Sequence, residues 1–258
     1  MPEIPDLEIF SKNLNKRLSG KQVTDVIVHQ TKSLNVAAEA LTEALKNATL
    51  SEVKREGKTT HFVFSNQQVL EVHLKLMGEF DIVRSETEVN YKILSVRFDE
   101  QDYLVISDSR LFAILTLNPK PVNVPDAMEL TLRYLSKQLK KKKAKNIKAF
   151  LIDQRIVRGI GNAYADEILW ESRISPESLC GKIPDNAVNT LFNAIKVVLK
   201  EATEQLEEVK PDLIKGEYRE FLKVHHPQKK VSPTGQPIHC KKIASKKTYY
   251  TDDQQCYN

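Results

Sequence analysis

The sequence has few cysteines and no long run of apolar residues. Its 258 residues include three cysteines, Cys180, Cys240 and Cys256, and so sparse and odd a set argues against a disulfide framework and favours a reducing compartment. No stretch is apolar enough to span a membrane, and the acidic, proline-marked segment 1–6 is neither a secretory signal nor a transit peptide. We therefore expect a soluble cytoplasmic protein.

Positive charge is concentrated in two segments. The formal net charge is +5, with 41% hydrophobic residues, enough for a substantial core. Segments 137–148 and 223–247 each hold seven lysines and no acidic residue, so the remainder of the chain is net negative. Such patches attract polyanions, but a solvated lysine-rich face is an equally good interpretation of the charge alone.

The residue pattern divides the chain into a strand-rich part and a helical part. Segment 5–19 has helical apolar spacing, and short alternating runs follow at 23–28, 60–65, 69–74, 79–83, 93–98, 103–108 and 112–117. After the proline-marked segment 119–126, helical patterns cover 126–139, 147–154, 163–172, 184–208 and 211–222. The pieces 237–243 and 247–251 are expected to pair as a hairpin.

This pattern predicts an α+β protein. We expect an N-terminal β-sandwich domain with a leading helix over residues 1–118 and a linker over 119–126. A helical domain over 127–224 and a basic β-hairpin over 225–258 complete the prediction.

Pro2 is a candidate nucleophile. Loss of Met1 in front of a small residue would leave a prolyl α-amine, and α-amines have a reference pKa near 7.7–8.0, against about 10.4 for lysine. A secondary amine condenses with an aldehyde-level carbon to an iminium ion, which suits covalent catalysis at a sugar C1′. Glu3 can move protons beside it. A Met-Pro-Glu start also occurs by chance, so this motif does not decide the function alone.

The segment 147–170 forms a second motif. Gly159 and Gly161 allow tight turns before a helix that begins near Asn162, and helix N-termini bind phosphates through free N–H groups. Lys148 lies just upstream and adds positive charge. An ordinary helical hairpin with Asn162 as its N-cap is the alternative.

Together, Pro2-Glu3 and the block 160–167 (IGNAYADE) resemble the formamidopyrimidine-DNA glycosylase/endonuclease VIII family, and the resemblance runs nearly end to end. It implies a helix–two-turn–helix fold and a monomer. The sequence Arg55-Glu56-Gly57-Lys58 resembles the turn that delivers a catalytic lysine, here Lys58. His73, in the block 73–78, matches a phosphate-contacting histidine.

The resemblance also implies residues that enter the DNA stack. Leu76 falls at the position of a void-filling methionine, and either Leu76 or its neighbour Met77 can take that role. Arg110 matches the arginine that faces the orphaned base, and Phe112 matches the wedge. Extruding a nucleotide costs a few kcal/mol, and such side chains offset it. Without the family resemblance, core packing would be the better interpretation of Phe112 and Leu76.

The C-terminal segment departs from the family pattern. Many relatives carry a zinc hairpin with four cysteines, but those positions are Val231, Thr234, Thr251 and Gln254 here, so no zinc tetrad is possible. We expect a zincless hairpin and no cofactor. Lys246 stands where the family has a phosphate-gripping arginine and supplies charge without a two-pronged fork. A substitute site is conceivable, but its spacing matches no zinc pattern; its ligands would come from His225, His226, His239, Cys240 and Cys256.

Asp6 is a second departure, since relatives have glutamate there. We assign it to the catalytic group beside Pro2, Glu3 and Lys58, where a shorter carboxylate would retune substrate choice. The stretch 209–218, where some relatives cap an oxidised purine, is short and names no lesion.

These observations predict a DNA base-excision repair glycosylase with AP lyase activity, an enzyme that acts on double-stranded DNA with a damaged base or an abasic site. The alternative is a damaged-DNA-binding protein with little or no catalysis, which the missing zinc, Lys246 and Asp6 would permit. A single-strand or RNA binder is the weaker third interpretation, because Phe112 and Tyr249 are too few for a stacking platform.

Overall fold

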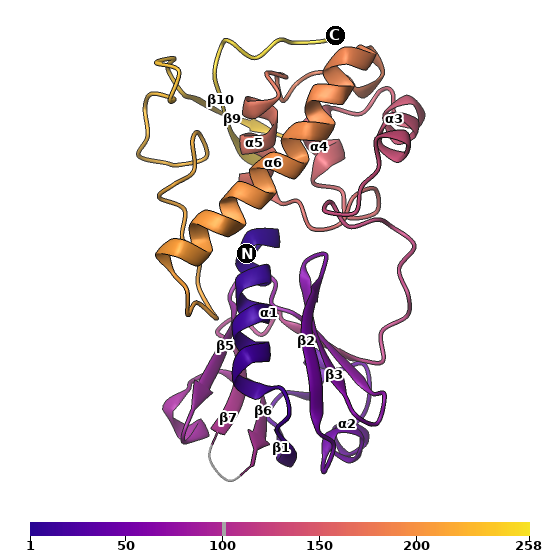
Figure 1. The fold of residues 1–258 in the computed structure, drawn as a ribbon, viewed down its shortest axis with the longest axis vertical. Coiled ribbons are helices and arrows are strands. Elements are labelled where there is room, and N and C mark those ends of the chain that lie inside the picture. Colours follow the sequence, from indigo (N-terminus) through magenta and orange to yellow (C-terminus); the bar gives the residue numbers. More distant parts are fainter. Residues whose placement is uncertain (100–101) are drawn as a thin grey trace. The chain divides into compact units, whose positions relative to one another are not determined.

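The computed structural model describes residues 1–99 and 102–258 and separates into two compact units (Figure 1). The first unit comprises residues 1–122 and 206–217, and the second comprises 123–205 and 218–258. The division after residue 122 lies inside the predicted linker 119–126. We predicted one undivided domain over 127–224, but residues 206–217 of that range belong to the first unit.

The first unit consists of a leading helix and two four-stranded antiparallel sheets. Its helices are α1 (Ile4–Leu18), α2 (Ala38–Leu45) and the short 3-10 helices η1 (Thr31–Ser33) and η2 (Glu86–Glu88). One sheet has the order β1-β6-β7-β5, from β1 (Val23–Val28), β6 (Lys92–Phe98), β7 (Asp102–Asp108) and β5 (Gly78–Val83). The other has the order β2-β3-β4-β8, from β2 (Leu50–Glu56), β3 (Thr59–Phe64), β4 (Val69–His73) and β8 (Ile114–Leu117).

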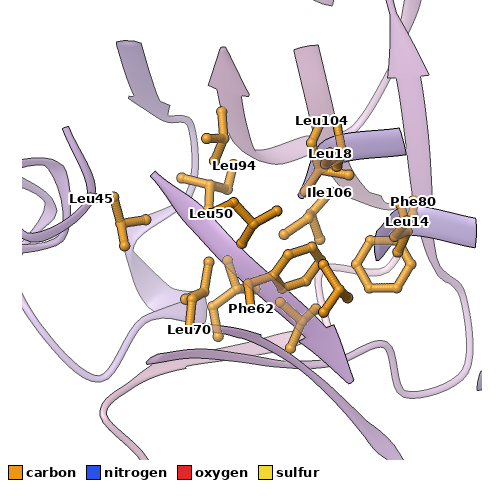
Figure 2. Close-up of a cluster of buried hydrophobic side chains, with 14 of the residues drawn as sticks. Leu14, Leu18, Leu45, Leu50, Phe62, Leu70, Phe80, Leu94, Leu104 and Ile106 are labelled. Carbon is orange, nitrogen blue, oxygen red and sulfur yellow. The ribbon is translucent and has the colours of Figure 1, made fainter. Parts of the chain in front are cut away.

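Apolar side chains from both sheets and from α1 form one core (Figure 2). Phe62 of β3 and Phe80 of β5 meet edge to face with ring centroids 5.8 Å apart, so they join the two sheets. Leu14 and Leu18 of α1 are fully buried in the same cluster. Because alternate strand residues point to opposite faces, this core uses one face of each sheet and leaves the loops at the strand ends available for function.

Two elements of the first unit were not predicted. β2 is an outer strand of its sheet and carries mostly charged residues, with only Leu50 and Val53 buried. α2 is short and buries only Leu41 and Leu45. β2 lacks the apolar alternation on which a sequence-based assignment depends, and α2, although Leu41 and Leu45 have helical spacing, spans only eight residues.

The predicted helix over 211–222 is wrong. This stretch forms turns, with Gly216 in the left-handed region at φ +78°. The side-chain amide of the buried Asn13 donates to the carbonyls of Pro211 and Leu213 at 2.8 and 2.9 Å. Leu213 packs against the core of the first unit. Tertiary contacts therefore override the helical spacing of the sequence.

The second unit is helical and ends in a two-stranded hairpin. Its helices are α3 (Leu132–Lys141), α4 (Ile147–Leu151), α5 (Asn162–Glu171), the short η3 (Cys180–Lys182) and α6 (Asp185–Val209), whose last residues belong to the first unit. β9 (His239–Ile243) pairs with β10 (Lys246–Tyr250) as predicted. The expected α+β class is confirmed. Among the described residues, no helix combines the length and the apolar character needed to cross a membrane.

Candidate active site and nucleic-acid interface

Pro2 and Glu3 lie directly before α1 in the first unit. Both are buried, and Glu3 is the N-cap residue of the helix. The Asp6 carboxylate accepts the backbone N–H of Glu3 at 2.9 Å, and Asp6 has no exposed surface. Because its carboxylate is fully enclosed and bound to the backbone of Glu3, Asp6 is placed to position the start of the chain, and its assignment to the catalytic group stays a prediction.

Lys58 lies at the tip of the β2–β3 hairpin, half-buried, after Gly57 at φ +61°. The neighbouring Arg55 is the anchor of this tip. Its Nε donates to Glu8 at 2.7 Å, and its Nη1 donates to the carbonyl of Gly57 at 3.1 Å. Since Glu8 belongs to the second turn of α1, Arg55 attaches the lysine-bearing tip to the helix that Pro2 and Glu3 precede.

His73 is a neutral hydrogen-bond donor at physiological pH. Burial, followed by the charges of Lys75 and Lys58, lowers the pKa of His73 to about 4. Its Nδ1 accepts the backbone N–H of Lys75 at 3.0 Å, so the proton of the neutral ring is assigned to Nε2. A ring held in this tautomer can donate to a phosphate oxygen.

Two loops of the first unit present exposed apolar side chains. The β4–β5 loop carries Leu76 and Met77, which are 51% and 48% exposed, and the β7–β8 loop carries Phe112, which is 54% exposed. Gly78, the first residue of β5, pairs directly with Asp108, the last residue of β7. The two loops therefore lie at the same end of these neighbouring strands. This exposure excludes the core-packing interpretation of Phe112 and Leu76 and suits insertion into a base stack.

The β7–β8 loop is shaped by Asp108, to which we assigned no role from the sequence. Its buried carboxylate accepts three backbone N–H groups, from Arg110 and Ala113 at 2.8 Å and from Phe112 at 2.9 Å. Leu111 between them has φ +56°. The carboxylate therefore fixes the backbone that presents the exposed Arg110 and Phe112. Aspartate commonly organises following backbone groups in this way, which was the available signal.

In the second unit, a side-chain amide fixes the segment between α4 and α5. Gln154 donates to the carbonyls of Ile152 and Ile160 at 3.0 and 2.8 Å and accepts the N–H of Gly159 at 2.9 Å. Gly159 has φ +99°, which a side chain would strain. These bonds set the direction in which α5 begins.

Asn162 is the first residue of α5, and Gly161 is its N-cap. Asn162 is therefore not the N-cap residue of the alternative interpretation. Its side-chain amide donates to the carbonyl of Lys247 in β10 at 2.9 Å. The N-terminal end of α5 and the basic hairpin are thus joined directly within the second unit.

Lys148 does not form part of a DNA-contacting surface. Its side chain is fully buried, pairs with the buried Asp166 and donates to the carbonyl of Asn162 at 3.1 Å. The expectation that Lys148 binds DNA is therefore corrected to an internal role. Asp166 also accepts the ring N–H of His225 at 2.6 Å and the backbone N–H of Tyr249 at 3.0 Å. The Asp166 carboxylate thus connects α5, on which it lies, with α4, with the segment that contains His225 and with β10.

Lys246 opens β10 and is exposed. It follows a two-residue turn in which Ala244 and Ser245 have φ +50° and +62°. Because Asn162 and Asp166 bind the backbone of this strand, the ammonium group extends from a fixed support. The second unit can therefore hold phosphates with the N-terminus of α5 and with Lys246.

Three of the candidate ligands of a substitute metal site make other contacts in the structure. His225 contacts Asp166, His239 contacts Asp252, and Cys256 contacts Asn258. Among the described residues, no group of three or more histidine, cysteine or acidic side chains is placed to hold a metal. The family positions Val231, Thr234, Thr251 and Gln254 supply no thiolate or imidazole, so these residues do not fit zinc.

Models of known protein families match both parts of the chain. The family model of the formamidopyrimidine-DNA glycosylase N-terminal domain matches residues 1–115, and that of the formamidopyrimidine-DNA glycosylase H2TH domain matches residues 120–210. A formamidopyrimidine-DNA glycosylase of Ligilactobacillus salivarius is 34% identical in an alignment that covers 79% of this chain and 78% of that protein. One from Pediococcus pentosaceus is 29% identical in an alignment that covers 97% of each chain.

Solved structures share the fold. The complex of Lactococcus lactis Fpg with DNA containing an abasic site has a TM-score of 0.88 at 22% identity. The similarity covers 98% of this chain and 100% of that chain.

Proposed function

The chain belongs to the formamidopyrimidine-DNA glycosylase family and is a DNA glycosylase of base-excision repair, and we propose that the amine of Pro2 is its nucleophile. The observation that carries this proposal is the organised chain start, in which Asp6 holds the backbone of Glu3. Arg55 fastens the tip that bears Lys58 to the same helix. A binding protein without catalysis has no need of this arrangement. The substrate is duplex DNA with a damaged base or an abasic site.

Removal of Met1 is a requirement of this mechanism. In the full-length chain the terminal amine belongs to Met1 and pairs with Glu217, while the nitrogen of Pro2 is part of a peptide bond and is not nucleophilic. Once Met1 is removed, an α-amine with a reference pKa near 7.7–8.0 is partly unprotonated at neutral pH. It can then attack an electrophilic carbon.

The steps balance without a metal or an external redox partner. The Pro2 nitrogen bonds to C1′ of the damaged nucleotide, and the departing base takes the electron pair of the N-glycosidic bond and a proton. Glu3 and Lys58 are assigned to proton transfer at the base and the sugar. Opening of the C1′–O4′ bond then gives an iminium ion, and loss of a C2′ proton expels the 3′ phosphate, which nicks the strand.

Other residues hold the distorted DNA in this proposal. Lys58 and His73 contact phosphates from the first unit, and Asn162 and Lys246 do so from the second. Leu76 or Met77 fills the space left by the extruded nucleotide. Arg110 faces the orphaned base, while Phe112 wedges the stack.

Borohydride trapping tests the nucleophile. We expect wild-type protein to form a covalent band with a labelled abasic duplex, and a panel of lesion duplexes then identifies the excised base. Pro2→Gly should lose the band and most strand nicking while it still shifts the duplex in a gel. Near-normal nicking by Pro2→Gly would overturn the role of Pro2. Absence of a wild-type band on every duplex would favour a binding protein.

We also propose that the hairpin needs no zinc. The support is the chemistry of Val231, Thr234, Thr251 and Gln254, which offers no zinc ligand of the usual kind. Metal analysis of purified protein should find far less than one zinc per chain, and one zinc per chain would refute the proposal. A cytoplasmic location, beside the DNA if the organism is bacterial, is the last part of the proposal, supported by the bacterial relatives.

A further inference from the structure

The loop before β9 and the segment after β10 share a cluster of polar side chains with little exposed surface. Ser232, Thr251 and Gln254 are 5%, 1% and 6% exposed, although each carries polar atoms. Burying such atoms without partners is costly. Their partners therefore show what the cluster holds together.

Asp253 is the centre of this cluster. Its carboxylate accepts hydrogen bonds from the hydroxyl of Thr251 and from the hydroxyl of Thr234, the latter at 3.4 Å. It also pairs with the guanidinium of Arg173, which follows α5. The hydroxyl of Thr234 lies 2.9 Å from that of Ser232. One carboxylate thus joins the loop before β9, the segment after β10 and the end of α5.

Gln254 makes a second connection between the same segments. Its side-chain oxygen accepts the backbone N–H of Thr251 at 2.8 Å, and its side-chain nitrogen donates to the carbonyl of Ile174 at 2.9 Å. The backbone continues the pairing, since the N–H of Ser175 donates to the carbonyl of Gln255 at 2.8 Å. The base of the hairpin is therefore attached to the chain that leaves α5.

The hairpin is held at both ends of β10. Near its start, Asn162 binds the carbonyl of Lys247, and further along Asp166 binds the N–H of Tyr249. Directly after its last residue, the Asp253 cluster fixes Thr251. A two-stranded hairpin alone is at best marginally stable in water, and small modules without a large core need a staple. Polar bonds supply that staple here.

We propose that Asp253 and Gln254 are positioning residues for DNA binding, which hold the β9–β10 hairpin so that Lys246 meets a phosphate. Three members of the cluster, Thr234, Thr251 and Gln254, stand where the family resemblance places zinc cysteines, so hydrogen bonds and one ion pair take over the mechanical role of a metal. This inference rests on the proposed function, because it assigns the hairpin to DNA.

The test compares Asp253→Ala with a matched control on the adjacent residue. Asp252 is an exposed carboxylate of the same segment that contacts His239 outside the cluster, so Asp252→Ala removes equal charge. The measurements are the dissociation constant for a duplex with an abasic-site analogue and the single-turnover nicking rate at saturating abasic DNA. Hydrogen exchange of the β9–β10 amides reports the hairpin itself.

We expect Asp253→Ala to weaken affinity about tenfold, the loss expected for one or two hydrogen bonds to a charged group, with the saturating rate unchanged. Asp252→Ala should remain within about twofold of wild type, since exposed pairs contribute little. The double variant Asp253→Ala/Lys246→Ala should have the same DNA affinity as whichever single variant binds DNA more weakly. The two changes are not additive, because both remove the phosphate contact that the β9–β10 hairpin makes through Lys246.

Gln254→Met is the second variant if Asp253→Ala does not fold, since it removes the side-chain bonds to Thr251 and Ile174 without adding a charge. It should speed exchange of the hairpin amides and weaken affinity in the same direction. Equal affinities for the Asp253 variant, the Gln254 variant and the control would overturn the inference. A fall in the saturating rate as large as the fall in affinity would also overturn it. Trapping by wild-type protein decides the proposed function separately.

Discussion

At the scale of single residues, burial separates groups that face DNA from groups that support them. Lys148 and Lys246 have the same chemistry, but Lys148 is enclosed with Asp166 and Lys246 is exposed at a strand end. His73 lies between these extremes, since its ring is partly enclosed and one nitrogen is already bonded to the backbone. Each difference predicts a measurable consequence.

The depressed pKa of His73 makes stability depend on pH. Between the ordinary value of 6.5 and about 4, the folded protein binds fewer protons at this ring than the unfolded chain does. The contribution of His73 to the free energy of unfolding is therefore constant above pH 6.5. It falls as the pH is lowered towards 4, by up to roughly 3 kcal/mol.

Urea unfolding across this pH range checks the effect. His73→Gln lacks the titrating ring, so the stability difference between wild type and variant should shift by that amount between neutral pH and about pH 4.5. The comparison removes the contributions of titrating groups that do not interact with His73, such as Asp102, whose pKa is lowered first by its hydrogen bond from Lys21. Parallel curves for the two proteins would contradict the assignment.

Salt dependence distinguishes the two lysines. A lysine that neutralises a phosphate contributes about 0.9 to the slope of log affinity against log salt concentration. Lys246→Ala should therefore reduce the slope by about 0.9. Lys148→Met should leave it unchanged but cost roughly 3 to 5 kcal/mol of stability, because it leaves Asp166 buried without its ion-pair partner. A reduced slope for Lys148→Met would restore Lys148 to the DNA interface.

At the scale of elements, the turns set where the functional side chains point. Gly78 follows the β4–β5 loop, and a Cβ there would lie 2.4 Å from the carbonyl oxygen of Leu74, so only glycine closes this loop without displacement. Asp108 plays the corresponding part in the neighbouring loop by binding three backbone N–H groups. The exposed residues Leu76 and Phe112 therefore extend from fixed backbones at the same end of β5 and β7.

The two residues of the turn between β9 and β10 are not the ones that its backbone conformation favours. Ala244 and Ser245 both have positive φ, the conformation of a type I′ turn that Asn-Gly prefers. The double change Ala244→Asn/Ser245→Gly should slow hydrogen exchange of the β9–β10 amides by an amount that corresponds to about 1 kcal/mol. Both side chains are exposed, so no contact is lost. Unchanged or faster exchange would show that the turn is not strained.

At the scale of the whole molecule, motifs and periodic elements were predictable, whereas tertiary polar contacts were not. The leading helix, most strands and the hairpin follow from apolar spacing, because burial of one face produces that pattern. The block around Asn162 identifies the second unit. The role of Asp253 depends on partners such as Arg173 that the fold brings to it, and its sequence surroundings do not distinguish it from a solvated carboxylate.

The same limit explains the errors. β2 was missed because its charged residues hide the alternation of an outer strand. The stretch 211–222 has helical spacing, but Asn13 binds its carbonyls and Leu213 joins the core. Lys148 lies in a basic run and is nevertheless enclosed, because Asp166, 18 positions later, neutralises it.

The docking of 206–217 on the first unit leads to a final prediction. Residues 1–122 contain the sheets, but Leu213 and Ile214 cover part of their core, and Asn13 loses two acceptors when the segment is absent. A fragment of residues 1–122 should therefore be less stable than the same fragment joined by a flexible linker to 206–217. The difference should be about 2 to 3 kcal/mol, from partial burial of two aliphatic side chains and the bonds to Asn13.

Urea unfolding followed by circular dichroism measures this difference. Asn13→Ala in the linked fragment is the matched control, since it keeps the apolar cover and removes only the two amide bonds. Its stability should lie between those of the other two. Equal stability with and without 206–217 would mean that the segment lies on the sheets without stabilising them, and that the continuous sequence 1–122 contains everything the first unit needs to fold.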